Sequence, residues 1–183
     1  MKVQWIIISA VLLVAIGCAA QPGPASSTST PEDAIRTLRE LAGLPDLPVQ
    51  FVGMVTMANS PDGNLQVGSY KDSQGRLYSV DLATNQVVEV DGRAAMPTQP
   101  AGTLMADSEL KTRAETLART TTPNFDTVTA GLTFTSGNKG GGLSFFDWRG
   151  QTAPGASMPR FIQVALSGDG TLVGYINTVI LPQ

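Results

Sequence analysis

The side chains that most often perform enzyme chemistry are almost absent from this sequence. It contains no histidine and a single cysteine, Cys18. Histidine is the commonest general base and the commonest transition-metal ligand, so imidazole-based triads and zinc sites built from imidazole or several thiolates are excluded. We therefore expect a protein that is not an enzyme and that holds no metal ion or other cofactor.

Carboxylates could still act as an acid and a base, and two pairs stand close together in the sequence. Glu32 and Asp33 follow Thr30 and a proline, which is typical of a helix N-terminus, where acids interact favourably with the helix dipole. Glu89 and Asp91 are expected to be solvated at the end of a strand. Both pairs are better explained by structure than by catalysis.

Two glycine-containing segments share part of the pattern of ligand-binding loops. In residues 136–142, SGNKGGG, Lys139 is followed by glycines and a predicted strand, whereas a phosphate-binding loop needs Gly-Lys-Ser/Thr at the start of a helix. Asp62-Gly63-Asn64 lacks the remaining oxygen ligands of a calcium loop. We expect residues 136–142 to connect two strands of a hairpin.

Cys18 follows a segment that is typical of secreted proteins. Lys2 precedes an apolar run, WIIISAVLLVAI, that is about 12 residues long, whereas a transmembrane helix needs about 20. The residues before the thiol, Ala15-Ile16-Gly17, resemble the lipobox of bacterial lipoproteins, with Ala15 where leucine is commonest. The resemblance implies diacylglyceryl transfer to the Cys18 sulfur and cleavage after Gly17. The alternative is an ordinary signal peptide with an incidental cysteine.

The segment after Cys18 predicts a tether on the outer side of a bacterial membrane. Residues 19–30, AAQPGPASSTST, carry no charge and no large apolar side chain, so they cannot bury enough surface to fold. Without residues 1–17 the chain has 11 basic and 15 acidic side chains and therefore a net charge of −4. We expect a membrane contact through the lipid on Cys18 and no nucleic-acid partner.

The remainder of the chain predicts helices and short strands in a repeating order. An amphipathic helix is expected between Thr30 and Gly43, and a second one between Asp107 and Thr122. Clusters of turn residues separate the strands that follow each helix. The predicted strands are 49–57, 65–70, 76–82 and 87–90 in the first half, and 127–134, 142–148, 160–166 and 171–179 in the second.

The two halves are similar to each other at an offset of 84 residues. This offset aligns Val80 with Val164 and Leu82 with Leu166 without a gap, which favours an internal repeat. RLYSVDLATNQVVEVDG (76–92) and RFIQVALSGDGTLVGYIN (160–177) resemble the closing hairpins of PepSY-type modules, and the second half resembles repeats of secreted YcdB/YcdC-like bacterial proteins. The resemblance implies a cystatin-like helix packed on a curled antiparallel sheet. It also implies binding or inhibition, because such modules occur in protease propeptides and cell-surface regulatory proteins.

The segment 143–149, LSFFDWR, is apolar on both faces of a predicted strand. Alternation places Leu143 and Phe145 on one face and Phe146 and Trp148 on the other. One interpretation is a central strand that is covered on both sides. The alternative is a partner-binding patch formed by Phe146, Trp148 and Arg149, since aromatic residues and arginine are enriched at interface hot spots.

These observations predict an α+β protein with two tandem modules, each a short helix packed on a curled antiparallel sheet. The expected divisions are a signal peptide (1–17), a lipidated tether (18–30), a first module (31–91), a connector (92–106) and a second module (107–183). The expected function is that of a non-catalytic, lipid-anchored extracytoplasmic protein that binds or regulates another protein such as a protease. The alternative is a structural cell-envelope component that self-associates or packs in a membrane complex. An enzyme that uses carboxylates or backbone groups alone is a third alternative.

Overall fold

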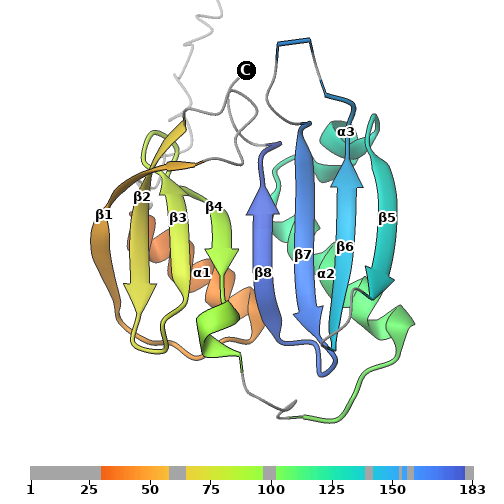
Figure 1. Cartoon of the computed structure of the whole chain (residues 1–183), viewed down its shortest axis with the longest axis horizontal. Helices are drawn as coiled ribbons and strands as arrows, with labels where there is room; N and C mark the ends of the chain where they lie inside the picture. The colour runs from red at the N-terminus through yellow and green to blue at the C-terminus, as the bar shows by residue number, and fades with distance from the viewer. Residues whose placement is uncertain are drawn as a thin grey trace, which may run out of the picture.

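The computed structural model describes residues 30–57, 65–96, 102–138, 142–152, 154–155 and 159–179. Their eight strands form one antiparallel sheet in the order β1-β2-β3-β4-β8-β7-β6-β5, with the α-helices behind it in Figure 1. The protein is therefore α+β, as predicted. The elements are α1 (Pro31–Ala42), β1 (Val49–Met57), β2 (Leu65–Asp72), β3 (Leu77–Asp81), β4 (Gln86–Asp91), the 3-10 helix η1 (Arg93–Ala95), α2 (Asp107–Thr121), α3 (Phe125–Thr129), β5 (Thr133–Asn138), β6 (Leu143–Arg149), β7 (Phe161–Ser167) and β8 (Leu172–Asn177).

The first helix begins and ends where the sequence predicts. The Thr30 hydroxyl accepts a hydrogen bond from the backbone N–H of Asp33 at 3.2 Å, and the Asp33 carboxylate accepts one from the backbone N–H of Thr30 at 3.3 Å. Gly43 ends the helix in the left-handed region at φ 66°, which favours glycine. The side chains of Ile35 and Leu38 are buried against the sheet.

The second helix is held on the sheet by apolar burial and by one arginine. Leu110, Ala114 and Leu117 are buried at helical spacing. Arg113 donates to the carbonyl of Gly170 at 2.7 Å and to the carbonyl of Ala42 at 2.8 Å. It therefore links α2 to the β7–β8 turn and to the end of α1. Of the helices that the structure describes, none is long and apolar enough to cross a lipid bilayer.

The main core lies between the helices and one face of the sheet. Tyr78, Ile162, Val164 and Tyr175 are at most 1% exposed there. A smaller apolar cluster, Met57, Val67 and Val88, lies on the opposite face, where the sheet has no covering helix. The α-helices thus cover one face of the sheet, which we call the helix-covered face, and none of them lies on the other, which we call the helix-free face (Figure 1).

The two halves of the chain contribute four consecutive strands each to the single sheet. They join where β4 and β8 pair through Glu89–Ile176, Val90–Tyr175 and Asp91–Gly174. The strands next to this junction carry core side chains from both halves, so the main core is continuous across it.

The expectation of a strand at residues 127–134 is wrong. Phe125–Thr129 form the short helix α3, and strand β5 begins only at Thr133. Phe125 is buried in edge-to-face contact with Trp148, with ring centroids 5.6 Å apart, and Arg119 pairs with Asp126 at 2.7 Å. These tertiary contacts hold a helical turn in a segment whose β-branched residues favour a strand.

Candidate functional site

The residues predicted for a partner-binding patch do not lie together on the surface. Phe146 and Trp148 share a face, as alternation predicts, but that face packs against the helices and leaves them only 4% and 6% exposed. The Trp148 ring lies 5.6 Å from Phe125 and 5.1 Å from Phe134. The prediction that Phe146 and Trp148 form a binding patch is therefore wrong, because both side chains belong to the core. Cys18 lies outside the described residues.

Arg149, the third residue of the predicted patch, is exposed on the opposite face of the sheet. Its guanidinium carbon lies 4.9 Å from the centre of the Phe161 ring. This cation–π contact holds the side chain over its neighbour on β7, since Arg149 and Phe161 are paired in the sheet. Arg149 is thus separated from Phe146 and Trp148 by the thickness of the sheet.

Four of the eight large apolar side chains that are exposed in the described residues lie on strand β1. This strand is at one edge of the sheet (Figure 1). Phe51, Val52, Met54 and Val55 are 55%, 60%, 52% and 41% exposed. In the part of the chain that the structure describes, β1 pairs with β2 alone. The strand, VQFVGMVTM, contains no charged residue and no proline. We call this exposed row the β1 edge.

A bulge shapes the β1 edge. The pairing with β2 shifts between Phe51 and Gly53, and Gly53 has φ +150°, a value that residues with a side chain rarely adopt. The ring of Phe51 rests on Tyr70 with centroids 5.3 Å apart, on the helix-covered side, whereas Val55 is paired with Val67 on the helix-free side. The edge therefore offers backbone groups together with apolar side chains on both faces.

Such an edge is suited to pairing with another extended segment. Unprotected edge strands are templates for strand addition, and soluble proteins usually blunt them with charges, proline or a covering element. The opposite edge, β5, is far more polar, with exposed Thr133, Thr135 and Ser136. No sequence pattern distinguished the two edges, because edge position depends on the order of strands in the sheet.

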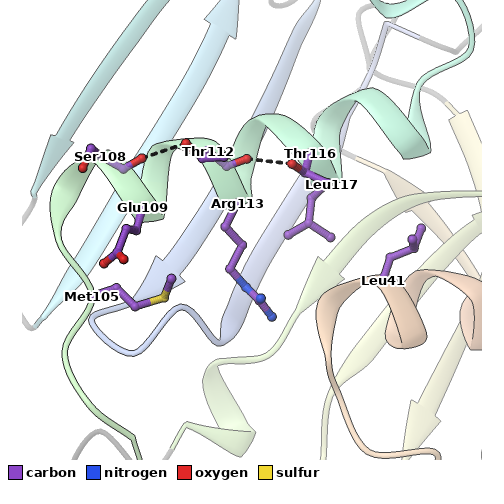
Figure 2. Close-up of a pocket in the computed structure, with 8 residues that line it drawn as sticks. All are labelled: Leu41, Met105, Ser108, Glu109, Thr112, Arg113, Thr116 and Leu117. Atoms are coloured by element: carbon purple, nitrogen blue, oxygen red, sulfur yellow. Dashed lines mark hydrogen bonds between the residues drawn. The ribbon is translucent and has the colours of Figure 1, made fainter.

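A groove in the helix layer is lined by polar side chains that already form hydrogen bonds within the protein. It has a volume of about 470 Å³ and lies along α2, facing Leu41 of α1 (Figure 2). The hydroxyls of Thr112 and Thr116 donate to carbonyls one turn earlier in α2, and the Glu109 carboxylate accepts from the backbone N–H of Ala106 at 2.8 Å. Arg113 is fixed by the two carbonyls named above. These bonds serve the helix and leave no poised acid or base.

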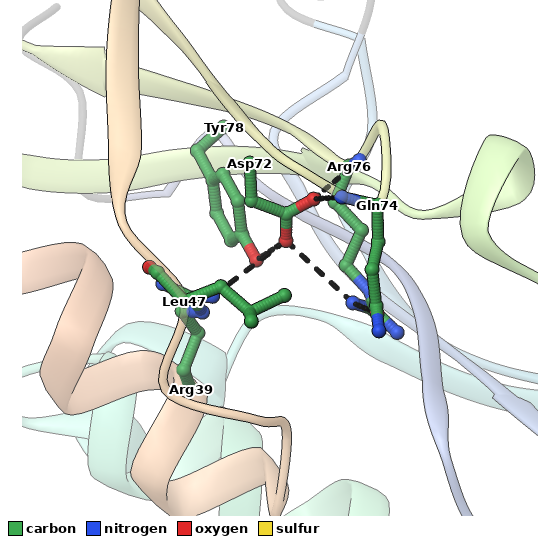
Figure 3. Close-up of polar contacts among 6 residues, drawn as sticks. All are labelled: Arg39, Leu47, Asp72, Gln74, Arg76 and Tyr78. Carbon is green, nitrogen blue, oxygen red and sulfur yellow. Dashed lines mark hydrogen bonds and ion pairs between the residues drawn. The ribbon is translucent and has the colours of Figure 1, made fainter.

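The most concentrated group of charges is buried between α1 and the β2–β3 hairpin. The Asp72 carboxylate accepts hydrogen bonds from the backbone N–H groups of Gln74 and Arg76 and from the Tyr78 hydroxyl, at 2.9, 3.0 and 3.2 Å (Figure 3). It also lies 3.5 Å from the Arg76 guanidinium and 3.7 Å from that of Arg39. Arg39 additionally donates to the carbonyl of Leu47. We call Arg39, Asp72, Arg76 and Tyr78 the Asp72 cluster.

The electrostatics of the Asp72 cluster indicate a structural role. Its four residues are at most 6% exposed. Burial raises the pKa of Tyr78 to about 12, so its hydroxyl remains a proton donor at neutral pH. The Nε atoms of Arg39 and Arg76 have no hydrogen-bond partner among the described residues. A substrate could not reach the carboxylate, and we assign the cluster to holding α1 on the sheet.

Within the described ranges, no three His, Cys, Asp or Glu side chains approach closely enough to share a metal ion. The features that remain as candidates for function are therefore surfaces. The β1 edge carries four of the eight large apolar side chains that are exposed in the described residues.

Comparison with known proteins supports the fold. No protein-family model and no curated protein matches this sequence. Among solved structures, the C-terminal domain of Bacillus megaterium YpeB is similar, with a TM-score of 0.53 and 13% sequence identity. The match covers 81% of this chain and 62% of that one, so the chain spans less than two thirds of that structure. The chain therefore has a PepSY-like fold, as the hairpin resemblance implies.

Proposed function

We propose that this protein is a non-catalytic binding module, anchored by lipid on Cys18 at the outer side of a bacterial membrane. Its partner is another extracytoplasmic protein, such as a protease that it regulates. The observation that carries the binding role is the β1 edge, with four apolar side chains 41% to 60% exposed on an uncharged edge strand. Exposed apolar patches on soluble domains mark interaction sites.

Strand addition is the mode of binding that fits this edge. A partner segment in extended conformation would pair with the outward backbone groups of β1, which supply affinity. Phe51 and Met54 on one face and Val55 on the other would supply specificity, because alternate side chains of the added strand meet opposite faces of the sheet.

The sequence before Pro31 supports the anchored location. A buried acyl methylene contributes about 0.8 kcal/mol, so one chain holds a protein only marginally and two or more hold it stably. Lipidation at Cys18 followed by the uncharged segment 19–30 would place α1 a short distance from the head groups. The anchor would thereby keep the β1 edge near partners on the same membrane surface.

We further propose that the sheet is built from two tandem PepSY-like modules, residues 31–91 and 107–183. The support is the offset of 84 residues, under which β1 and β5 begin at equivalent positions, as do β3 and β7. The PepSY-like resemblance also supports a regulatory partner, since related modules occur in protease propeptides.

Crosslinking and co-purification from the protein's own cells test this function. We expect the unaltered chain to capture an extracytoplasmic protein reproducibly. Val52→Lys and Met54→Lys should reduce capture by about tenfold or more, because lysine on an edge strand opposes strand addition. Thr135→Lys on the opposite edge is the matched control and should capture normally. Cys18→Ala should lose capture if the anchor is needed. Equal capture by the two edge variants and the control would contradict the proposal.

A structural envelope component is the second candidate, and the same edge favours it. Because β1 has no charge, two copies could pair their β1 strands antiparallel without placing like charges opposite each other. Concentration-dependent association of the purified chain, abolished by Val52→Lys, would support this role. Capture of the protein alone from cells would favour it over a regulatory one.

A further inference from the structure

A second surface feature lies on the helix-free face of the sheet, away from the β1 edge. It is a hollow of about 330 Å³ over strands β4, β8, β7 and β6. Its volume is at the lower end of the range for ligand pockets, about 300 to 1,000 Å³, and suits one or two side chains rather than a large cofactor. Glu89, Asp91 and Arg93 line it from the end of β4 and the start of η1, and Leu143, Phe145, Gln163, Ala165, Gly174 and Ile176 line it from the other three strands.

The pairing of the strands explains why a hollow forms there. One row across the sheet runs from Phe145 through Ala165 and Gly174 to Asp91. Ala165 and Gly174 have almost no side chain. The surface of the sheet is therefore depressed at these two residues, between the ring of Phe145 and the carboxylate of Asp91. A Cβ at Gly174 would lie 3.4 Å from that of Ala165, so a larger pair would fill the depression.

The next row of paired residues across the sheet forms one side of the hollow, and this side ends in a carboxylate. It runs from Asp147 through Gln163 and Ile176 to Glu89. The Gln163 amide is engaged, since it donates to the Asp147 carboxylate at 2.6 Å. Ile176 also packs against the small apolar cluster of the helix-free face. The hollow therefore has apolar sides and one charged end, where the carboxylates of Glu89 and Asp91 lie with the guanidinium of Arg93.

Two carboxylates lie at that end, and only one of them has an ion-pair partner in the described part of the chain. Asp91 is neutralised by Arg93, whose guanidinium donates to it at 2.9 and 2.6 Å. Glu89 forms no ion pair within the described part of the chain, and its contact with the Ser79 hydroxyl is long, at 3.5 Å. Burial raises the pKa of Glu89 and the nearby Asp91 adds to this effect, whereas the Ser79 hydroxyl and the charge of Arg93 oppose it. A further cation close to Glu89 would stabilise its charged form.

We propose that this hollow binds the side chain of a lysine or arginine presented by a polypeptide partner. The alkyl stem would lie along Leu143, Phe145 and Ile176, and the cationic end would pair with Glu89. Long basic side chains are suited to such sites because they bury an apolar stem while the charge stays at the rim. The net charge of −3 on the whole chain also favours approach by a basic partner. The identity of that partner rests on the proposed binding function, but the recognition chemistry does not.

The test uses the full chain, labelled with ¹⁵N and purified in detergent, and a blocked heptapeptide, Gly-Ser-Leu-Lys-Leu-Ser-Gly. The matched peptide carries norleucine in place of lysine, which keeps the stem and removes the charge. We expect the lysine peptide to shift the backbone resonances of Phe145, Ala165 and Ile176, and the norleucine peptide to bind at least about tenfold more weakly. A third arm uses n-butylamine, which represents a free small amine.

Glu89→Gln is the decisive variant, because it has the same shape and lacks the charge. It should weaken the lysine peptide about tenfold or more, which corresponds to about 1.4 kcal/mol. Glu40→Gln, which removes an exposed acid on α1, should bind normally. Phe145→Ala, which removes the aromatic wall, should weaken the peptide while Glu89 is retained. Thermal unfolding of each variant shows that it is folded.

Several results would overturn the proposal. The lysine peptide could shift no resonance, or the norleucine peptide could bind as tightly as the lysine peptide. The Glu89→Gln variant could bind the lysine peptide as tightly as the unaltered chain does, or n-butylamine could bind as tightly as the lysine peptide. Val52→Lys separates this inference from the proposed function, since that variant should keep peptide binding. Peptide binding without any partner in cells would contradict the proposed function alone, and a captured partner without peptide binding would contradict the hollow alone.

Discussion

Replacing Asp72 by alanine should lower the free energy of unfolding by about 3 to 5 kcal/mol. The buried carboxylate lies 3.5 Å from the Arg76 guanidinium and 3.7 Å from that of Arg39. At an effective dielectric constant of about 20, each pair has about 4 to 5 kcal/mol of Coulombic attraction, most of which offsets the cost of burying the charges. The variant keeps both guanidinium groups buried and loses this attraction. It also leaves the backbone N–H groups of Gln74 and Arg76 without their acceptor.

Urea unfolding followed by tryptophan fluorescence measures this loss, because Trp148 is buried in the core. Asp126→Ala is the matched control, since that carboxylate also pairs with an arginine, at 2.7 Å, but its side chain is 79% exposed. The control should lose less than about 1 kcal/mol. Asp72→Asn should fall between the two, because its amide oxygen can still accept from the backbone. Equal losses for Asp72→Ala and Asp126→Ala would refute the reasoning.

Three further predictions concern pH and packing. Burial raises the pKa of Tyr78 from 10.0 to about 12, so its contribution to stability is complete below pH 10 and is lost as the pH rises through 12. Tyr78→Phe should make the alkaline loss of stability shallower in urea titrations at several pH values, and an unchanged slope would contradict this. The hydroxyl of Ser167 and the backbone N–H groups of Thr171 and Gly102 hold the pKa of Asp169 at about 2, against 3.8 ordinarily. Its contribution is present above pH 3.8 and lost as the pH falls through 2, so Asp169→Asn should flatten the acid limb of the stability profile, and a limb as steep as before would argue against it. Trp148→Ala should cost about 3 to 5 kcal/mol by urea unfolding, since it empties a site between two aromatic rings, and a variant of normal stability would contradict the assignment of Trp148 to the core.

Much of the fold could be predicted from the sequence because its signals are local. Thr30, Pro31 and Gly43 mark the ends of α1, and the predicted strand 49–57 coincides with β1. Turn residues lie between segments in which apolar and polar residues alternate, and they predicted the ends of the other strands to within a few residues. The exception at residues 127–134 has a tertiary cause, since the buried contact of Phe125 with the distant Trp148 overrides a β-favouring composition.

The surfaces were harder to predict because a strand's sequence does not state which of its faces is covered. Alternation correctly separated Phe145 from Phe146, but it could not say which of the two meets the helices. The structure buries Phe146 against the helix layer and leaves Phe145 to line the hollow. The hollow itself arises from residues on four strands, and the other three all lie more than 50 residues after β4 in the sequence. No local pattern could have grouped them.

The exposure of β1 follows from how the two halves of the sheet join. β1 and β2 form eight residue pairs and are close in the sequence, so little chain entropy is lost when they pair. The junction of β4 with β8 has only three pairs, and these join residues that are far apart in the sequence. That junction places β4, which carries Glu89 and Asp91, inside the sheet and leaves the uncharged β1 outside. A sheet arranged only to avoid aggregation would do the reverse, because charged strands make the safer edges. The exposed β1 edge is therefore better explained by an interaction than by the stability of the isolated chain, and lysine at Val52 or Met54 should cost binding without costing stability.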